Sequence, residues 1–187
     1  MPATATTVTL EEFLSLPEQE EDGTHYELDE GELIRLSPTG KPHGRRIGIL
    51  HRYLLKYLPD DRWDILLGDV GFIMAGDPKA TVRGADVAIM PHEPEISEGM
   101  SREPAHLIIE VVSPSNTPDD IERKRVQYLE FGVQEVWIVY EKARTMHVYL
   151  NPATALRLNR QETFVCNEMS VFESSLRFPV IVRELFR

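Results

Sequence analysis

The 187-residue chain contains a single cysteine, Cys166. One cysteine cannot form an internal disulfide, and it cannot supply the several thiolates of a structural zinc or iron–sulfur site. Long hydrophobic runs are also missing, because no apolar stretch reaches the roughly 18 residues that a membrane-spanning helix requires. The N-terminus has neither the basic region nor the apolar region of a signal peptide. We therefore expect a cytoplasmic protein with no membrane contact.

Sequence signatures of several common enzyme classes are missing as well. The chain contains no P-loop, no glycine-rich dinucleotide-binding motif and no paired-histidine zinc motif. These absences argue against nucleoside triphosphates, dinucleotides and a zinc-protease site. Ser113 and Ser115 offer hydroxyls, but they do not lie in a nucleophile-elbow motif.

Positive charge is scarce. The chain has 20 Lys and Arg against 31 Asp and Glu, which gives a net charge of -11 at pH 7. This balance argues against a nucleic-acid partner, because such binding depends on neutralising phosphates. The acids are concentrated in residues 10–35, where they form either a solvated surface or, in part, a cation site. The basic residues that could form a local rim, or else a solvated helix face, are Arg45, Arg46, Arg52, Lys56, Arg62, Lys79 and Arg83.

Hydrophobic periodicity predicts alternating helices and strands. Helices are expected from Leu10 to before Pro17, after Pro42, and from a Thr117 cap to Gly132, with a helical turn at 181–186. The helix after Pro42 is expected to place Ile47, Leu50, Leu54, Tyr57 and Leu58 on one face. The predicted strands are 25–28, 32–36, 63–67, 70–75, 87–90, 107–112, 135–140, 146–150 and 164–167. The length favours one domain over residues 1–187. The element order predicts a mixed α/β fold with a central mixed sheet flanked by helices.

Two carboxylates stand where apolar residues are expected. Asp86 precedes the apolar run 87–90, and Glu110 interrupts the apolar run 107–112. Burying a lone carboxylate costs several kcal/mol, so each acid needs a partner or a cation. Two acids that hold a divalent cation beside a lysine, such as Lys124 on the following helix, suit phosphodiester hydrolysis. The alternative is structural, with Glu110 salt-bridged to Lys124 or Arg123 and Asp86 capping a turn.

These residues belong to an ordered series of short motifs. The series runs Tyr26-Glu27-Leu28 with Gly31, His43-Gly44, Asp86-Val87-Ala88, Ile109-Glu110-Val111-Val112-Ser113-Pro114-Ser115, Lys124 with Tyr128, and Gly132-Val133-Gln134-Glu135-Val136-Trp137-Ile138-Val139. Over about residues 8 to 186 it resembles the Uma-type family of restriction-endonuclease-like proteins in the PD-(D/E)xK nuclease superfamily. The resemblance implies a restriction-endonuclease-like core and magnesium- or manganese-dependent cleavage of nucleic acid, with DNA the expected substrate. A homodimer also fits, because small nucleases of this superfamily often pair to cut two strands.

The resemblance also implies roles for individual residues. Asp86 corresponds to the metal-binding aspartate of the superfamily, and Glu110 corresponds to the acid of its (D/E)xK motif, so both would bind the metal. The chain departs from the motif twice, with Ala85 in place of the proline and Val112 in place of the lysine. Lys124 matches a lysine that this family carries on the next helix. A long side chain from an adjacent helix can place its amine where the amine of the motif lysine would lie.

Three further residues have open roles. Glu27 corresponds to an N-terminal acid of the family, which binds metal directly or through water, or else is an exposed hairpin acid. His43 either faces a substrate phosphate or has no chemical role, and Tyr128 is expected to pack. The predicted function is a metal-dependent endonuclease with Glu27, Asp86, Glu110 and Lys124 as catalytic residues. The alternative is a catalytically silent nuclease-fold module for binding or regulation.

Overall fold

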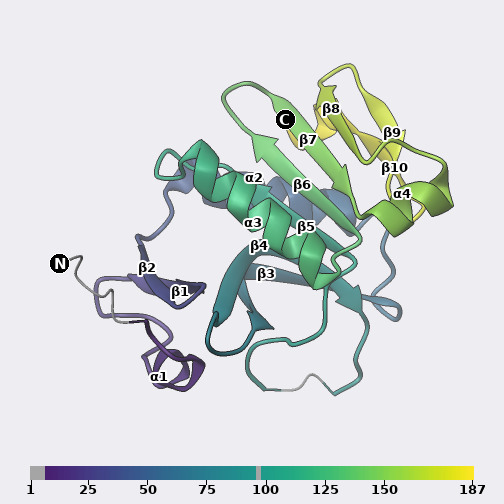
Figure 1. Cartoon of the computed structure of the whole chain (residues 1–187). Coiled ribbons are helices and arrows are strands. Elements are labelled where there is room, and N and C mark those ends of the chain that lie inside the picture. Colours follow the sequence, from purple (N-terminus) through teal and green to yellow (C-terminus); the bar gives the residue numbers. More distant parts are fainter. Residues whose placement is uncertain (1–6, 96–97) are drawn as a thin grey trace.

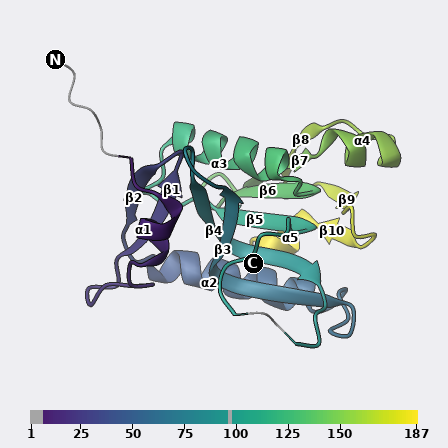
Figure 2. The same cartoon turned by 60° about the horizontal axis from the view of Figure 1, so that its bottom comes forward.

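A mixed β-sheet lies between two long helices in the computed structural model, which describes residues 7–95 and 98–187. Helix α2 (Lys41–Leu54) covers one face of the sheet and α3 (Pro118–Phe131) covers the other (Figure 2). The shorter helices are α1 (Leu10–Leu14), α4 (Pro152–Leu158) and α5 (Val182–Leu185). No helix in the described ranges is long and apolar enough to cross a membrane.

The main sheet has eight strands in the order β2-β1-β4-β5-β6-β7-β8, with β3 paired to β4 (Figure 1). Its strands are β1 (His25–Asp29), β2 (Glu32–Leu36), β3 (Trp63–Ala75), β4 (Thr81–Pro91), β5 (Leu107–Val111), β6 (Glu135–Tyr140), β7 (Thr145–Leu150) and β8 (Thr163–Asn167). Strands β5 and β6 are parallel and are joined through α3, whereas the other pairs are antiparallel. A separate two-stranded sheet contains β9 (Val171–Glu173) and β10 (Pro179–Ile181). The predicted mixed α/β fold is confirmed.

Local signals in the sequence define helix α3 well. Thr117 and Asp120 form a capping box, in which each side chain bonds to the backbone of the other residue. Pro118 stands in the first turn, where its missing N–H is not needed. Gly132 ends the helix at φ 112°, a left-handed conformation that favours glycine. These signals fix where α3 begins and therefore which of its side chains reach the sheet.

Three expected boundaries were wrong. The segments 63–67 and 70–75 form the single strand β3, because Gly68 and Asp69 form a bulge with positive φ rather than a turn. Strand β4 begins at Thr81 instead of residue 87, since its first half carries polar residues that hide the strand pattern. Helix α2 ends at Leu54, so Tyr57 and Leu58 lie beyond it.

The core has two main layers, one on each face of the sheet. Leu50 and Leu54 of α2 pack with Ile109 of β5 on one face. On the other face, Ile108 of β5 packs with Tyr128 of α3. Strand β5 is fully buried because successive side chains enter opposite layers. A polar side chain on β5 therefore has no route to bulk solvent except at the end of the strand.

The contribution of the α2 layer can be tested with two leucines on one helix segment. Leu50 is fully buried, whereas Leu55 is 54% exposed. Leu50→Ala should lower the free energy of unfolding by about 2–5 kcal/mol, because it leaves a cavity in the core. Leu55→Ala should change it by less than about 0.5 kcal/mol. Urea unfolding followed by circular dichroism measures both, and equal losses would contradict this account of the core.

Candidate active site

A pocket of about 230 Å³ lies where the β1–β2 hairpin, the start of α2, strand β4, the end of β5 and the start of α3 meet. The sequence-predicted residues that line it are Glu27, His43, Asp86, Glu110 and Lys124. They come from five different elements of the fold. The structure therefore brings all five predicted side chains together around one space.

Asp86 and Glu110 come from neighbouring antiparallel strands. Asp86 precedes Val87 on β4, and Val87 pairs with Ile109 on β5, directly before Glu110. Asp86 accepts a hydrogen bond from the backbone N–H of Val111 at 2.7 Å through Oδ2. Its Oδ1 lies 3.0 Å from His43 Nε2. Asp86 therefore does not cap a turn, and His43 contacts an acid of the pocket at the first turn of α2.

Lys124 reaches Glu27 and Glu110 from α3. Its Nζ lies 2.6 Å from Glu27 Oε1 and 3.8 Å from Glu110 Oε1, and it also donates to the Gly84 carbonyl at 3.2 Å. The Lys124 side chain is only 12% exposed, so the amine points into the pocket rather than to solvent. This placement matches the expectation that the lysine stands on the helix instead of at Val112.

Glu27 is not an exposed hairpin acid, because its side chain is 3% exposed. Its Oε1 accepts a hydrogen bond from the backbone N–H of Gly84 at 2.9 Å, and its Oε2 lies 3.1 Å from Arg83 Nη1. Together with Lys124, these partners surround both carboxylate oxygens. Glu27 thus ties the β1–β2 hairpin to β4 and holds the amine of Lys124 in place.

The sequence interpretation missed a buried network behind Glu27. Arg83 was predicted to lie in a local basic rim or on a solvated face, but its side chain is 3% exposed and lies 2.8 Å from Asp29 as well as 3.1 Å from Glu27. Asp29 also binds Arg123 and accepts a hydrogen bond from Gln127 at 2.7 Å. The signal in the sequence was weak, since Arg83 stands among other polar residues in the first half of β4 and interrupts no apolar run. Arg83 is required inside because two buried carboxylates face it.

Tyr128 was expected only to pack, and this expectation was incomplete. Its ring lies in the α3 layer of the core, but its hydroxyl lies 2.6 Å from Glu110 Oε1 and 3.0 Å from the Gly84 carbonyl, so its one hydrogen can be donated to either acceptor. Tyr128 stands four residues after Lys124, so both side chains lie on the same face of α3. That spacing was the available signal. The Tyr128 hydroxyl orients Glu110 by a hydrogen bond, while Lys124 places a positive charge beside it.

A family comparison matches residues 10–180 to the Uma2 family, described as "Putative restriction endonuclease". The chain belongs to this family. A crystal structure from Anabaena variabilis, described as a "putative nuclease belonging to DUF820", shares the fold with a TM-score of 0.70. That match has 20% sequence identity and covers 96% of this chain and 97% of the other. No curated protein matches the chain.

In this Uma2-family chain, burial perturbs the charges of the pocket. Burial raises the pKa of Asp86 and of Glu110, although Lys124 opposes both shifts. The negative charge of Asp86 adds to the rise at Glu110. Burial also acts to lower the pKa of Lys124, but Glu110 and Glu27 outweigh it and raise that pKa. The lysine therefore remains an ammonium, and the two acids hold protons more tightly than free carboxyls do.

The donor set of the pocket suits a hard divalent cation with few protein ligands. No group of three or more Asp, Glu, His or Cys side chains within residues 7–95 and 98–187 could hold a metal ion. A zinc site or a calcium cage needs such a group, whereas Mg²⁺ is commonly bound by one or two carboxylates together with waters and substrate phosphates. Asp86 and Glu110 are a set of that size, and burial, which raises the pKa of both, favours an added positive charge beside them.

The buried network can be tested by removing its central cation. Arg83→Met leaves Glu27 and Asp29 without a guanidinium that both contact, and it should cost about 3–5 kcal/mol of stability. Lys79→Met is the matched control, because the Lys79–Glu30 pair on the same segment is exposed and is worth at most about 1 kcal/mol. Chemical denaturation of both variants gives the two values. A small loss in Arg83→Met would show that the network is dispensable.

Proposed function

We propose that the chain is a divalent-metal-dependent nuclease that hydrolyses phosphodiester bonds in DNA. The observation that carries the proposal is the convergence of Asp86, Glu110 and Lys124 in one pocket, with the Lys124 amine 3.8 Å from Glu110. Membership of the Uma2 family supports a nuclease-like function. Asp86 and Glu110 would hold magnesium or manganese. The homodimer stays a prediction.

Each side chain of the pocket has a separate task in this proposal. A bound divalent cation polarises a phosphate and lowers the pKa of its bound water. The Lys124 ammonium stabilises negative charge that develops on the reacting phosphate, and Glu27 positions that ammonium. Tyr128 orients Glu110 through its hydroxyl. Burial lowers the pKa of His43, so at neutral pH the ring is mainly neutral. Its Nε2 can then form a hydrogen bond with Asp86 as donor or acceptor, depending on the tautomer.

Metal binding should be visible in the melting temperature. Mg²⁺ or Mn²⁺ should raise the melting temperature of the wild-type chain, because a ligand that binds only the folded state stabilises it. Asp86→Asn should abolish most of this rise, whereas Glu130→Gln, an exposed change on α3, should preserve it. An equal rise in Asp86→Asn and the wild type would exclude Asp86 as a ligand.

The same experiment has a defined pH dependence. Because the folded-state pKa values of Asp86 and Glu110 are raised, their contribution to stability is present at acidic pH and is lost as pH rises through those values. A metal must displace the bound protons, so its affinity should increase over the same pH range. Calorimetric titrations from pH 5 to pH 9, roughly the span in which carboxyls with raised pKa values titrate, measure this directly. A metal affinity independent of pH would contradict the raised pKa values.

Cleavage itself is tested with supercoiled plasmid at low salt with either metal. Glu110→Gln and Lys124→Met should each reduce nicking by about 100-fold or more, the usual effect of removing one charge-stabilising group. Lys124→Met should keep the metal-induced rise in melting temperature, since an ammonium does not bind the ion. Lys79→Met is the control. A wild-type chain that binds metal but cuts neither DNA nor RNA would instead be the catalytically silent module.

A further inference from the structure

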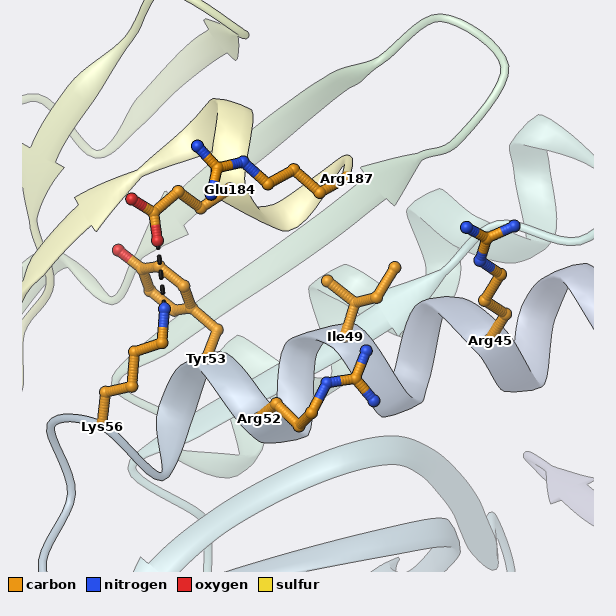
Figure 3. A pocket seen from close by; sticks show the side chains of 7 residues that line it. All are labelled: Arg45, Ile49, Arg52, Tyr53, Lys56, Glu184 and Arg187. Atoms are coloured by element: carbon orange, nitrogen blue, oxygen red, sulfur yellow. Dashed lines mark hydrogen bonds and ion pairs between the residues drawn. The ribbon is translucent and has the colours of Figure 1, made fainter.

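A second hollow of about 420 Å³ lies between α2 and the C-terminal segment that contains α5. Four basic side chains line it, namely Arg45, Arg52, Lys56 and Arg187, together with Glu184, Ile49 and Tyr53. Figure 3 shows the α2 side chains spaced along one side of the helix, with Glu184 and Arg187 across from its end. We refer to this hollow as the basic groove.

The cations of the basic groove are mostly unneutralised. Glu184 pairs with Lys56 at 3.1 Å. Within the described ranges of the chain, Arg45, Arg52 and Arg187 take part in no ion pair. The chain has more Asp and Glu than Lys and Arg, so these arginines do not lack partners because carboxylates are scarce. Free arginines gathered in one hollow of such a chain indicate an anionic ligand.

Helix α2 carries two glycines close in sequence to Arg45 and Arg52. Gly44 and Gly48 stand on α2, and a Cβ at Gly44 would meet nothing within 4 Å. At Gly48 the nearest atom is Arg52 Nη1, at 3.6 Å. Glycine within a helix costs about 1 kcal/mol relative to alanine, and no packing contact within the chain requires it at Gly44. At Gly48 the absence of a side chain leaves room for the Arg52 guanidinium beside the helix.

The chemistry of the groove favours a phosphate backbone over bases or an apolar peptide. Ile49 and Tyr53 are 8% and 2% exposed, so they offer little surface for stacking or apolar contact. The Tyr53 hydroxyl already donates to the Pro179 carbonyl and accepts from the N–H of Ile181. What remains is positive charge, and guanidinium groups bind phosphates through paired hydrogen bonds. A groove of this kind binds a duplex without reading its sequence.

The length of the groove matches several phosphates. Arg45 and Arg52 are seven residues apart on α2, which corresponds to about 10 Å at the helical rise per residue. Each strand of B-DNA carries one charge per roughly 3.4 Å of its axis, so this stretch spans several phosphates. Helix α2 also supplies His43 to the candidate active site at its first turn. One helix thus connects the pocket with the groove.

We propose that the basic groove binds the sugar–phosphate backbone of duplex DNA away from the bond that is cleaved. This proposal rests on the proposed function in one respect, namely that DNA is the nucleic acid the chain acts on. The groove binds the duplex whether or not the pocket cuts it. Arg45 and Arg52 make these contacts, because no carboxylate in residues 7–95 and 98–187 pairs with either of them.

The test is the salt dependence of binding to a short DNA duplex, followed by fluorescence anisotropy in EDTA so that no cleavage occurs. The double variant Arg45→Gln/Arg52→Gln should bind more weakly than the wild type. Its log–log slope against salt should be shallower by about two units, since each lost phosphate contact removes about 0.9. The control Arg102→Gln/Arg157→Gln changes the net charge equally at two exposed arginines outside the groove and should leave the slope unchanged.

The outcomes separate the groove from the active site. Binding of DNA through the groove without cleavage in magnesium would support the groove and overturn the nuclease proposal. Cleavage with equal binding by the groove variant and its control would overturn the groove and leave the nuclease proposal standing. A wild-type chain that binds no duplex at low salt would also overturn the groove. So would a groove variant whose only change is loss of self-association in sedimentation, because the occupant would then be an acidic segment of a second copy.

Discussion

The fold depends on neutralising carboxylates buried at one end of its sheet. Four acids, Glu27, Asp29, Asp86 and Glu110, are each at most 6% exposed. Burying an unpaired carboxylate costs several kcal/mol. Arg83 from β4 and Lys124 from α3 carry the compensating charge. Because the acids and the cations come from different elements, this requirement fixes the hairpin, the sheet and α3 relative to one another. The hydrophobic layers on both faces of the sheet stabilise the same arrangement of elements that these charge pairs require.

The four buried acids are not neutralised equally. This difference separates the acids with a structural role from those suited to bind a cation. Glu27 and Asp29 share Arg83 and further donors, and burial is outweighed at Asp29 because hydrogen bonds from Gln127 and Arg123 lower its pKa. Asp86 and Glu110 have weaker compensation, so burial raises their pKa values. The first pair forms a scaffold that is complete without a ligand. The second pair gains stability from an added positive charge, which is the property that a metal-binding pair requires.

The sequence contained local signals for most elements but few for the site network. The cap at Thr117 and the end at Gly132 are properties of adjacent residues, so α3 was predictable. Asp86, Glu110 and Lys124 were found because charges interrupt apolar segments or match a motif. The roles of Arg83 and Tyr128 could not be read in the same way, since they depend on Asp29 and Glu110, which only the folded sheet brings near. The buried position of Glu27 was likewise decided by the pairing of β1 with β2 and β4, which local pattern does not specify.

Net charge is a poor guide to the partner of this chain. The formal value of -11 counts Asp86 and Glu110 as ionised, although burial raises the pKa of both. A net value also hides where the charges lie, because Glu27 and Asp29 are each within 4 Å of a buried or half-buried cation. Solution charges act over a Debye length of about 8 Å at physiological ionic strength, so a ligand responds mainly to what lies beside it. Beside the basic groove that environment is positive, because Arg45 and Arg52 have no carboxylate partner in the described part of the chain. An acidic protein can therefore present a phosphate-binding surface when its acids are buried or paired elsewhere.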